Sequence, residues 1–481
     1  MKRAIVFAAV MVLAGAGLRA APFTPGDLVI LRVGNGTEAL TNAGDSLFLD
    51  EYTTNGAFVQ SVPAPTNGFV SASGVTNYPI VLTGGNVSEG ELSLSTDGRY
   101  LVFVGFGTNG IWVSANGGNI STTAGASIPR VVGRADGSGD LDTSTAIIND
   151  LTTGTGNDVR GVASTDGSNF WVTSSALGAS YTLLGTNGAV KIVAGNKRTC
   201  SIFNQRPEYV YPPGHQQLYS VSQGGPFSPG TNLPTVASGE IGLTNIVYGT
   251  TTNSYYGLIA LHLQDGTSSN IDTVYLADDG VTTAGVGGIS KWTYNPAVSN
   301  VWYQTGFISQ STGPNAVNTI GTGGVRQMTG MVSVTGNQTN VTVYVTASGN
   351  TANIFGNLYV ITDTSGFGGT LSGTLPAPIA TAPANTTWRG VAFAPADTLR
   401  VTSVAKSSND VNLTWNARAG RRYVVQSTPG DANGNYNPIG FVDIGPTNFT
   451  LGFGPTQNNY VDIGGATNKT RYYRVRLVAE P

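Results

Sequence analysis

One position of a repeated sequence frame carries most of the side chains that could bind a charged ligand. Two copies are clearest, residues 91–98 (ELSLSTDG) and 160–167 (RGVASTDG), and each precedes an alternating apolar run with aromatic residues. Along the chain the first position of the frame holds Glu91, Arg160, Arg198, Tyr256, Arg326 and Arg389. Guanidinium groups bind carboxylates and phosphates through paired hydrogen bonds. The frame therefore predicts a site for an anionic ligand. The alternative is that these arginines bind backbone carbonyl oxygens of the next repeat.

A second set of charged residues lies near the C-terminus. Residues 398–481 hold nine Lys and Arg against five Asp and Glu, a net charge of +4, whereas residues 21–397 carry −10. Tyr472, Arg474 and Arg476 occupy alternate positions, so they share one face of a strand. The strand that holds Arg422 is the expected neighbour. These four residues form a predicted attachment patch for an anionic glycan, lipid headgroups or the acidic part of the chain; a solvated face is the alternative.

Oxygen ligands for a metal ion are few. The consecutive Asp278 and Asp279 could contribute to a calcium site, with solvated carboxylates as the alternative. Residues 431–435 (DANGN) resemble the start of a calcium loop, but Tyr436 stands where the loop needs Gly and Val442 where it needs Glu. The sequence therefore assigns no metal ligand, and we expect no cofactor, with a calcium ion as the alternative.

Support for a catalytic residue is equally limited. His215 follows a Pro-Pro-Gly turn, His262 alternates with leucines, and no Gly-x-Ser-x-Gly element accompanies them. The single cysteine, Cys200, lies in an alternating run and is interpreted as a small buried apolar residue. One cysteine cannot form an internal disulfide.

Strands must position these residues. Short alternating runs such as 28–33, 100–104, 272–276 and 340–345 are separated by Gly, Asn, Asp, Ser and Thr, and no segment has a convincing helical period. The chain has 66 Gly and only 51 charged residues among 481. This composition is typical of an all-β protein rich in turns, and argues against a helical bundle or charge-driven disorder. The net charge of −3 gives no indication of nucleic-acid binding.

The spacing of the frame predicts a β-propeller over residues 21–397. Successive copies begin about 40 to 70 residues apart, as expected for blades with inserted loops. The last copy, 389–395, has no aromatic strand after it, and we expect strands within 26–33, 46–53 and 57–63 to complete its blade and close the ring. This count gives six blades; seven is the alternative, because residues 200–325 define their repeats loosely.

Two resemblances refine this prediction. Residues 411–415 (VNLTW) and 472–477 (YYRVRL) resemble strands of a fibronectin type III domain, which implies a small β-sandwich over 398–481. Residues 272–279 (DTVYLADD), followed by 287–292 (GGISKW), resemble secreted bacterial propellers of the YVTN/NHL type. That superfamily includes binding proteins, lactonases and lyases, so it does not fix a function.

Residues 1–20 have the pattern of a secretory signal peptide. Lys2 and Arg3 precede an apolar run that ends near Ala20, and no later stretch is long and apolar enough to span a membrane. We therefore expect export, to the extracellular space, the periplasm or the cell surface, of a mature chain with net charge −6.

These observations favour a secreted, monomeric, non-catalytic binding or surface-associated protein. The propeller mouth would bind a ligand and the basic sandwich would provide attachment; the polar, weakly charged composition favours carbohydrate as the ligand. The alternatives are an extracellular lactonase, lyase or glycan-cleaving enzyme with a divalent ion at the mouth, and a structural spacer of a cell-surface layer.

Overall fold

The protein is all-β in the part of the chain that the computed structural model describes. The described residues are 21–71, 73–109, 118–148, 158–175, 178–193, 196–204, 216–220, 255–263, 271–280, 287–295, 297–298, 302–317, 323–335, 338–352, 354–396, 401–418, 422–431, 433–436, 440–446, 448–449, 455–467 and 470–477. Their helical structure consists of two short 3-10 turns, Ile120–Thr122 and Gly465–Thr467. None of their helices is long and apolar enough to cross a membrane.

Most strands between residues 92 and 381 form antiparallel sheets in chain order. The first set is β7 (Leu92–Leu94), β8 (Tyr100–Phe106), β9 (Arg130–Asp136) and β10 (Leu141–Ile147). The second set is β11 (Val159–Ala163), β12 (Asn169–Ser174), β13 (Gly178–Leu183) and β14 (Val190–Val193). The pair β15 (Cys200–Asn204) and β16 (Gln216–Ser220) follows.

Two further sets complete this series. One set is β17 (Tyr255–Leu261), β18 (Thr273–Asp278), β19 (Gly288–Thr293) and β20 (Tyr303–Ser309), and β24 (Leu371–Thr374) pairs parallel with β20. The other set is β21 (Gly323–Thr335), β22 (Gln338–Gly349), β23 (Gly356–Asp363) and β25 (Ala380–Thr381). Each of the first five copies of the frame thus pairs with the aromatic strand that follows it, which confirms that part of the repeat prediction.

The last copy of the frame pairs with the start of the chain. β26 (Thr387–Phe393) is antiparallel to β1 (Leu28–Val33), with Leu28 opposite Phe393. β1 pairs with β2 (Asp45–Tyr52), and β2 with β3 (Phe58–Pro63). β6 (Val81–Leu82) pairs with both β2 and β8, which joins this set and the first into one nine-stranded sheet. A small hairpin of β4 (Phe69–Val70) and β5 (Thr76–Asn77) lies beside β10.

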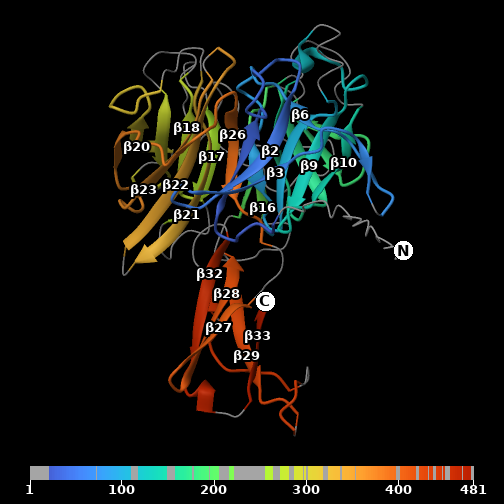
Figure 1. Cartoon of the computed structure of the whole chain (residues 1–481). Coiled ribbons are helices and arrows are strands. Elements are labelled where there is room, and N and C mark those ends of the chain that lie inside the picture. The colour runs from blue at the N-terminus through green and yellow to red at the C-terminus, as the bar shows by residue number, and fades with distance from the viewer. Residues whose placement is uncertain are drawn as a thin grey trace, which may run out of the picture.

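The first strands of the sheets lie against one another, as in a β-propeller (Figure 1). β26 contacts β7, β7 contacts β11, and β11 contacts β15; β17 contacts β21, which contacts β26. Apolar side chains fill the space between the sheets. One cluster joins Val29, Leu49, Phe103, Val162 and Phe170 from five different strands, all buried.

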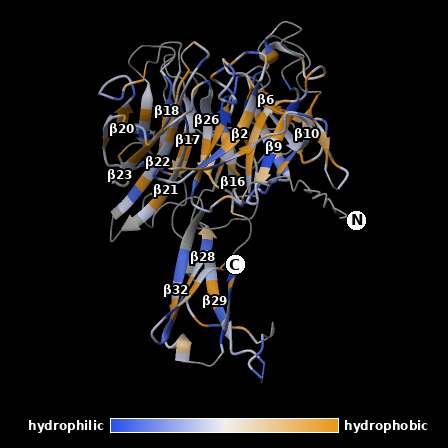
Figure 2. Ribbon diagram, in the orientation of Figure 1, coloured by the Kyte–Doolittle hydropathy of each residue, from blue (hydrophilic) through white to orange (hydrophobic). Residues whose placement is uncertain are grey.

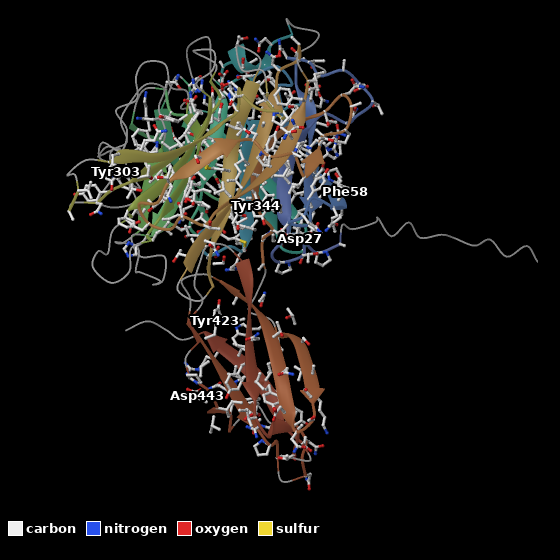
Figure 3. The ribbon with its side chains drawn as sticks, turned by 90° about the vertical axis from the view of Figure 1, so that its left-hand side faces the viewer. Asp27, Phe58, Tyr303, Tyr344, Tyr423 and Asp443 are labelled. Atoms are coloured by element: carbon white, nitrogen blue, oxygen red, sulfur yellow. The ribbon has the colours of Figure 1, made fainter. Side chains whose placement is uncertain are left out.

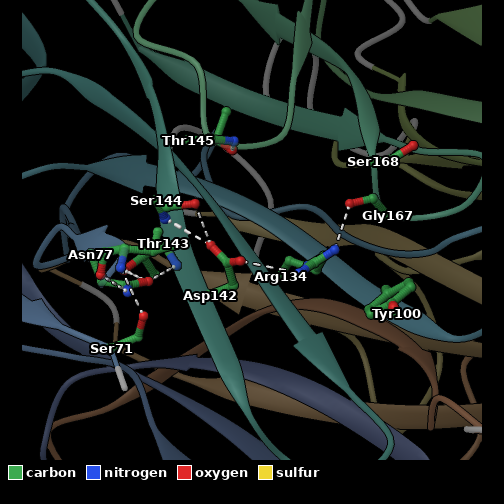
Figure 4. A network of polar contacts seen from close by, with 12 residues as sticks. Ser71, Asn77, Tyr100, Arg134, Asp142, Thr143, Ser144, Thr145, Gly167 and Ser168 are labelled. Atoms are coloured by element: carbon green, nitrogen blue, oxygen red, sulfur yellow. Dashed lines mark hydrogen bonds and ion pairs between the residues drawn. The ribbon is translucent and has the colours of Figure 1, made fainter. Parts of the chain in front are cut away.

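Polar contacts also connect neighbouring sheets. The Arg134 guanidinium donates to the Asp142 carboxylate and to the Gly167 carbonyl oxygen, at 3.0 Å each, and lies 4.6 Å from the centre of the Tyr100 ring (Figure 4). Gly167 has φ +77°, and a Cβ there would lie 2.4 Å from that ring. The turn at Asp166-Gly167 therefore also packs against the preceding sheet.

Residues 401–477 form two further sheets that share one core. The first sheet is β27 (Val401–Ser407), β28 (Asp410–Arg418) and β32 (Pro455–Asp462). The second is β29 (Arg422–Thr428), with β30 (Val442–Asp443), β31 (Asn448–Phe449) and β33 (Tyr472–Leu477). Buried Leu413 and Trp415 of β28 pack with Tyr423 and Val425 of β29. In Figure 1 these sheets form a separate, narrower body, and Figure 2 shows both apolar and hydrophilic residues along their strands.

Candidate functional site

The recurring frame position is a β-bulge in four of the first strands. Between Val159 and Gly161 the register with β12 skips one residue, Arg160. Tyr256 and Arg326 are the skipped residues of β17 and β21. In β26 two residues, Arg389 and Gly390, lie opposite one residue of β1. A bulge redirects a side chain relative to the regular pleat, so the sequence repeat corresponds to a repeated change of side-chain direction.

Glycine follows three of these bulge residues because neighbouring sheets approach closely there. A Cβ at Gly161 would lie 1.6 Å from Oε2 of Glu91, and a Cβ at Gly257 would lie 2.4 Å from the Arg326 carbonyl oxygen. A Cβ at Gly390 would lie 2.2 Å from the backbone nitrogen of Leu92. A larger residue at Gly257 or Gly390 would meet the backbone of the neighbouring first strand, and one at Gly161 would displace the Glu91 carboxylate.

Tyr256 brings two of the frame arginines together. The guanidinium carbon of Arg198 lies 4.0 Å from the centre of the Tyr256 ring, and that of Arg326 lies 4.3 Å from it. The Tyr256 hydroxyl is 2.9 Å from the hydroxyl of Ser88, in the loop before β7. Cation–π contacts of this kind strengthen when water is excluded, and all three side chains are buried.

Arg326 and Arg160 each have an acidic partner. Arg326 forms an ion pair with Asp279 and donates to the Val87 carbonyl oxygen, which lies in the loop before β7. Arg160 lies 3.6 Å from the Asp158 carboxylate and donates to the side-chain oxygen of Asn196 at 2.7 Å.

Arg389 has a different environment, because its hydrogen-bond acceptors in the described part of the chain are neutral. Its guanidinium donates to the carbonyl oxygens of Gly84 and Gly349, at 3.0 and 3.3 Å, and to the Ser348 hydroxyl at 3.4 Å. Burial is the main cause that lowers the pKa of Arg389 to about 9, and nearby Arg326 adds to it. These contacts agree with the alternative interpretation of the frame, in which its arginines bind backbone carbonyl oxygens of the next repeat.

One donor of each of these arginines has no acceptor, however. The Nε atoms of Arg160, Arg326 and Arg389 are buried and have no hydrogen-bond partner among the residues that the structure describes. Their side chains are at most 7% exposed. A buried donor without an acceptor costs about 1–3 kcal/mol, and more when the donor is charged. An acceptor supplied by a ligand would remove this cost.

Glu91 does not join the arginines through its carboxylate. Its side chain accepts hydrogen bonds from the Thr199 hydroxyl and from the backbone nitrogen of Cys200, at 3.1 Å for the second, at the start of β15. Burial raises the pKa of Glu91 to about 8. Burial, and then the Asp158 charge, raise the pKa of the nearby Glu89 to about 8 as well. Both carboxyl groups are therefore largely protonated at neutral pH.

The structure thus brings together part of the predicted set. Tyr256 contacts Arg198 and Arg326, and Arg326 is electrostatically coupled to Arg389, as Arg160 is to Arg198. We refer to Arg160, Arg198, Tyr256, Arg326 and Arg389 as the arginine cluster. Asp158 and Glu89 are not among the residues predicted from sequence, although each lies two residues before a frame position.

The candidate calcium residues have protein partners. Asp278 and Asp279 are buried rather than solvated. Asp278 accepts from the Gly280 backbone at 2.9 Å, and Asp279 pairs with Arg326. The Asp431 carboxylate caps its own turn, since it accepts from the backbone nitrogens of Asn433 and Asn435. Within the described ranges no three His, Cys, Asp or Glu residues are grouped so as to hold a metal ion.

His262 and Cys200 each have a protein partner. His262 lies 2.9 Å from the Asp272 carboxylate, and His215 is outside the described residues. Cys200 is fully buried, and its thiol donates to the Trp171 carbonyl oxygen at 3.1 Å.

Two arginines of the predicted attachment patch have partners on neighbouring strands. β33 lies beside β29, with Arg474 opposite Gln426 and Tyr472 opposite Thr428. Arg474 donates to the Gln426 side chain at 2.7 Å, and Arg476 lies 3.2 Å from Asp443. The backbone of Arg422 pairs with Phe449, and its side chain is outside the described part.

Comparisons with known proteins show no family. No protein-family model matches the chain, and no curated protein does. Among solved structures it is similar to "YCF48 bound to D1 peptide", at 9% identity and a TM-score of 0.27, covering 69% of this chain and 77% of that one. It is also similar to the β-propeller domain of the Trilobed protease from Pyrococcus furiosus, at 9% identity and a TM-score of 0.25, covering 82% and 90%. Likeness at this level transfers no ligand to this chain.

Proposed function

We propose that this protein is a secreted, non-catalytic binding protein that takes the carboxylate or phosphate group of its ligand at the arginine cluster. Residues 1–20 would direct export and be removed. Residues 21–397 would form a six-bladed ring, closed by β1, β2 and β3 with β26, and residues 398–481 a fibronectin type III-like sandwich for attachment. The six first strands β7, β11, β15, β17, β21 and β26 support the blade count.

One observation carries the proposal: the buried Nε donors of Arg160, Arg326 and Arg389 have no acceptor among the described residues. Buried donors nearly always have an acceptor, because the interior offers no water to replace a missing one. The bulges direct these side chains from equivalent places on three strands. An oxyanion has enough acceptor sites to satisfy several such donors at once.

Charge supports the same ligand class. Arg389 is buried among neutral acceptors, and Glu89 and Glu91 keep their protons at neutral pH because of burial. A buried cation without a partner is costly, so an anionic ligand would stabilise the folded protein on binding.

The test is a thermal-shift titration of the full mature chain with inorganic phosphate, citrate and galacturonate. A ligand present at 100 times its Kd stabilises the folded state by about 2.7 kcal/mol, so at least one of the three should raise Tm in a saturable way. Arg326→Gln should raise the Kd for that ligand about 10- to 100-fold, since a hydrogen bond to a charged group contributes about 1.5–3 kcal/mol. Arg160→Lys, which keeps the charge but loses Nε, should also raise it.

Arg134→Gln is the matched control, because Arg134 is paired with Asp142 and contacts Gly167 outside the arginine cluster. It should leave the affinity unchanged. A Tm that none of the three anions raises would contradict the proposal, and so would equal affinities for the wild type and the two cluster variants.

A further inference from the structure

Three aromatic side chains contact one another at the surface of the C-terminal sheets. The Tyr436 ring lies 5.4 Å from the Tyr472 ring and 6.3 Å from the Phe441 ring, measured between ring centres. The Arg474 guanidinium lies 4.3 Å from the centre of the Phe441 ring. Tyr436 is 62% exposed although it is aromatic and in contact with two other rings. We call Tyr436, Phe441, Tyr472 and Arg474 the aromatic strip.

The strip is held in place by the backbone around it. Tyr472 donates its hydroxyl hydrogen to the Gly434 carbonyl oxygen at 3.0 Å, which ties β33 to the turn before Tyr436. That turn is fixed by Asp431, whose carboxylate accepts from two of its backbone nitrogens. A Cβ at Gly430 would lie 3.0 Å from the Tyr472 ring, so this end of the strip is closely packed. Rings held in this way lose little conformational freedom when a ligand covers them.

Planar polar groups border the strip on one side. Gln426 accepts from Arg474 and donates to Asp443 at 2.6 Å. Asp443, labelled in Figure 3, also pairs with Arg476, and both side chains are nearly half exposed. Each cation or amide thus already has a neutral or opposite partner. Exposed ion pairs of this kind contribute about 0–1 kcal/mol, so the patch offers little electrostatic attraction to an anionic surface.

This combination fits a sugar ring better than a charged surface. One face of a pyranose consists of C–H groups, which pack on an aromatic ring, while its hydroxyls both donate and accept hydrogen bonds. Tyr436 supplies the exposed ring, and the half-exposed Asp443 and Arg476 supply planar acceptors and donors at its border. Gln426 is buried and orients Arg474 and Asp443. A lipid headgroup would instead need arginines whose charge is not already balanced.

From this geometry we infer that the aromatic strip is a polysaccharide-binding site, which packs a pyranose face on Tyr436 and hydrogen-bonds its hydroxyls at the Asp443–Arg476 pair. The inference rests on the proposed attachment role of residues 398–481 and names its ligand. In this site, stacking of the sugar on an aromatic ring, rather than attraction between charges, contributes most of the binding free energy. Binding should therefore depend little on ionic strength.

Affinity electrophoresis of the full mature chain tests this inference, with gels that contain xylan, mixed-linkage β-glucan, galactomannan or polygalacturonate. At least one polymer should retard the wild type, and raising NaCl from 0.05 to 0.5 M should change the apparent Kd less than two-fold. Tyr436→Ala should weaken binding about 5- to 10-fold, in line with an aromatic contact worth about 0.5–1.5 kcal/mol. Tyr436→Phe should bind as the wild type does.

Ile463→Ala is the matched control, because Ile463 is 85% exposed in the turn that follows β32 and is not part of the aromatic strip. It should bind normally. The inference is overturned if no polymer retards the chain, if Tyr436→Ala binds as tightly as Ile463→Ala, or if retardation occurs only with polygalacturonate and disappears at 0.5 M NaCl. Binding to phosphatidylserine vesicles that Arg476→Gln abolishes, without binding to any of the polymers, would also overturn it.

The same variants separate this inference from the proposed central site. Tyr436→Ala should keep the thermal shift caused by the anion, and Arg326→Gln should keep retardation by the polysaccharide. Failure of one test therefore leaves the other proposal standing.

Discussion

Glu91→Gln should change how the stability of the protein depends on pH. Glu91 is 3% exposed, and burial raises its pKa from 4.5 to about 8. Between these values the folded state holds a proton that the unfolded state has lost, so stability falls as pH rises. One such proton gives a slope of about 1.4 kcal/mol per pH unit. Between pH 5 and pH 7 Glu91 therefore lowers the free energy of unfolding by about 3 kcal/mol.

Glutamine has no charge to bury, and its amide oxygen can still accept some of the hydrogen bonds that Glu91 receives from Thr199, Cys200 and neighbouring serines. It loses those made to the second carboxylate oxygen, a cost that does not depend on pH. The variant should thus be less stable than the wild type at pH 5, and the difference should shrink or reverse by pH 8. When the free energy of unfolding is plotted against pH, the slopes of the two proteins should differ by about 1.4 kcal/mol per pH unit, which corresponds to one proton.

Urea unfolding followed by tryptophan fluorescence at pH 5, 6, 7 and 8 measures both curves. The exposed Glu38→Gln serves as the control and should run parallel to the wild type. Parallel curves for Glu91→Gln and the wild type would refute the reasoning, because they would mean that Glu91 titrates in the folded state as it does in the unfolded chain.

Three further predictions concern buried contacts. Gly161→Ala should lower the free energy of unfolding by at least 2 kcal/mol, because the new Cβ would overlap the Glu91 carboxylate; chemical denaturation measures the loss. Lys291→Met should lower it by about 3–5 kcal/mol, because it removes the partner that lies 2.8 Å from buried Asp363, and a loss below 1 kcal/mol would contradict this. The Cys200 thiol, buried and with its pKa raised by burial, should not react with Ellman's reagent until the protein unfolds, so rapid reaction of the native protein would show that the site opens.

The repeat could be predicted from sequence because strands and turns leave local signals. Alternation and Asp-Gly turns gave the frame at Glu91 and Arg160, and the structure pairs each of these frames with the aromatic strand that follows. The bulge at Arg160 also left a signal, the adjacent Gly161, but the reason for that glycine lies in a contact with Glu91, 70 positions earlier in the chain. A local sequence pattern gives no information about contacts between residues so far apart in the chain.

Partners of charged groups were harder to predict for the same reason. Sequence spacing placed Arg474 and Arg476 on one face but could not show that Gln426 and Asp443 already bind them. Equivalence in the frame also suggested that Glu91 shares an environment with the arginines, whereas its carboxylate instead bonds to the start of β15. A shared position in a repeat fixes where a side chain begins, and the neighbouring sheet decides where its charged end lies.

The most direct test of the central claim is a crystal structure of the mature protein grown with selenate, with data collected at the selenium absorption edge. The proposal predicts an anomalous peak within hydrogen-bond distance of Nε of Arg160, Arg326 or Arg389. An ordered map in which protein groups or water satisfy all three Nε atoms, with no peak near them, would contradict it.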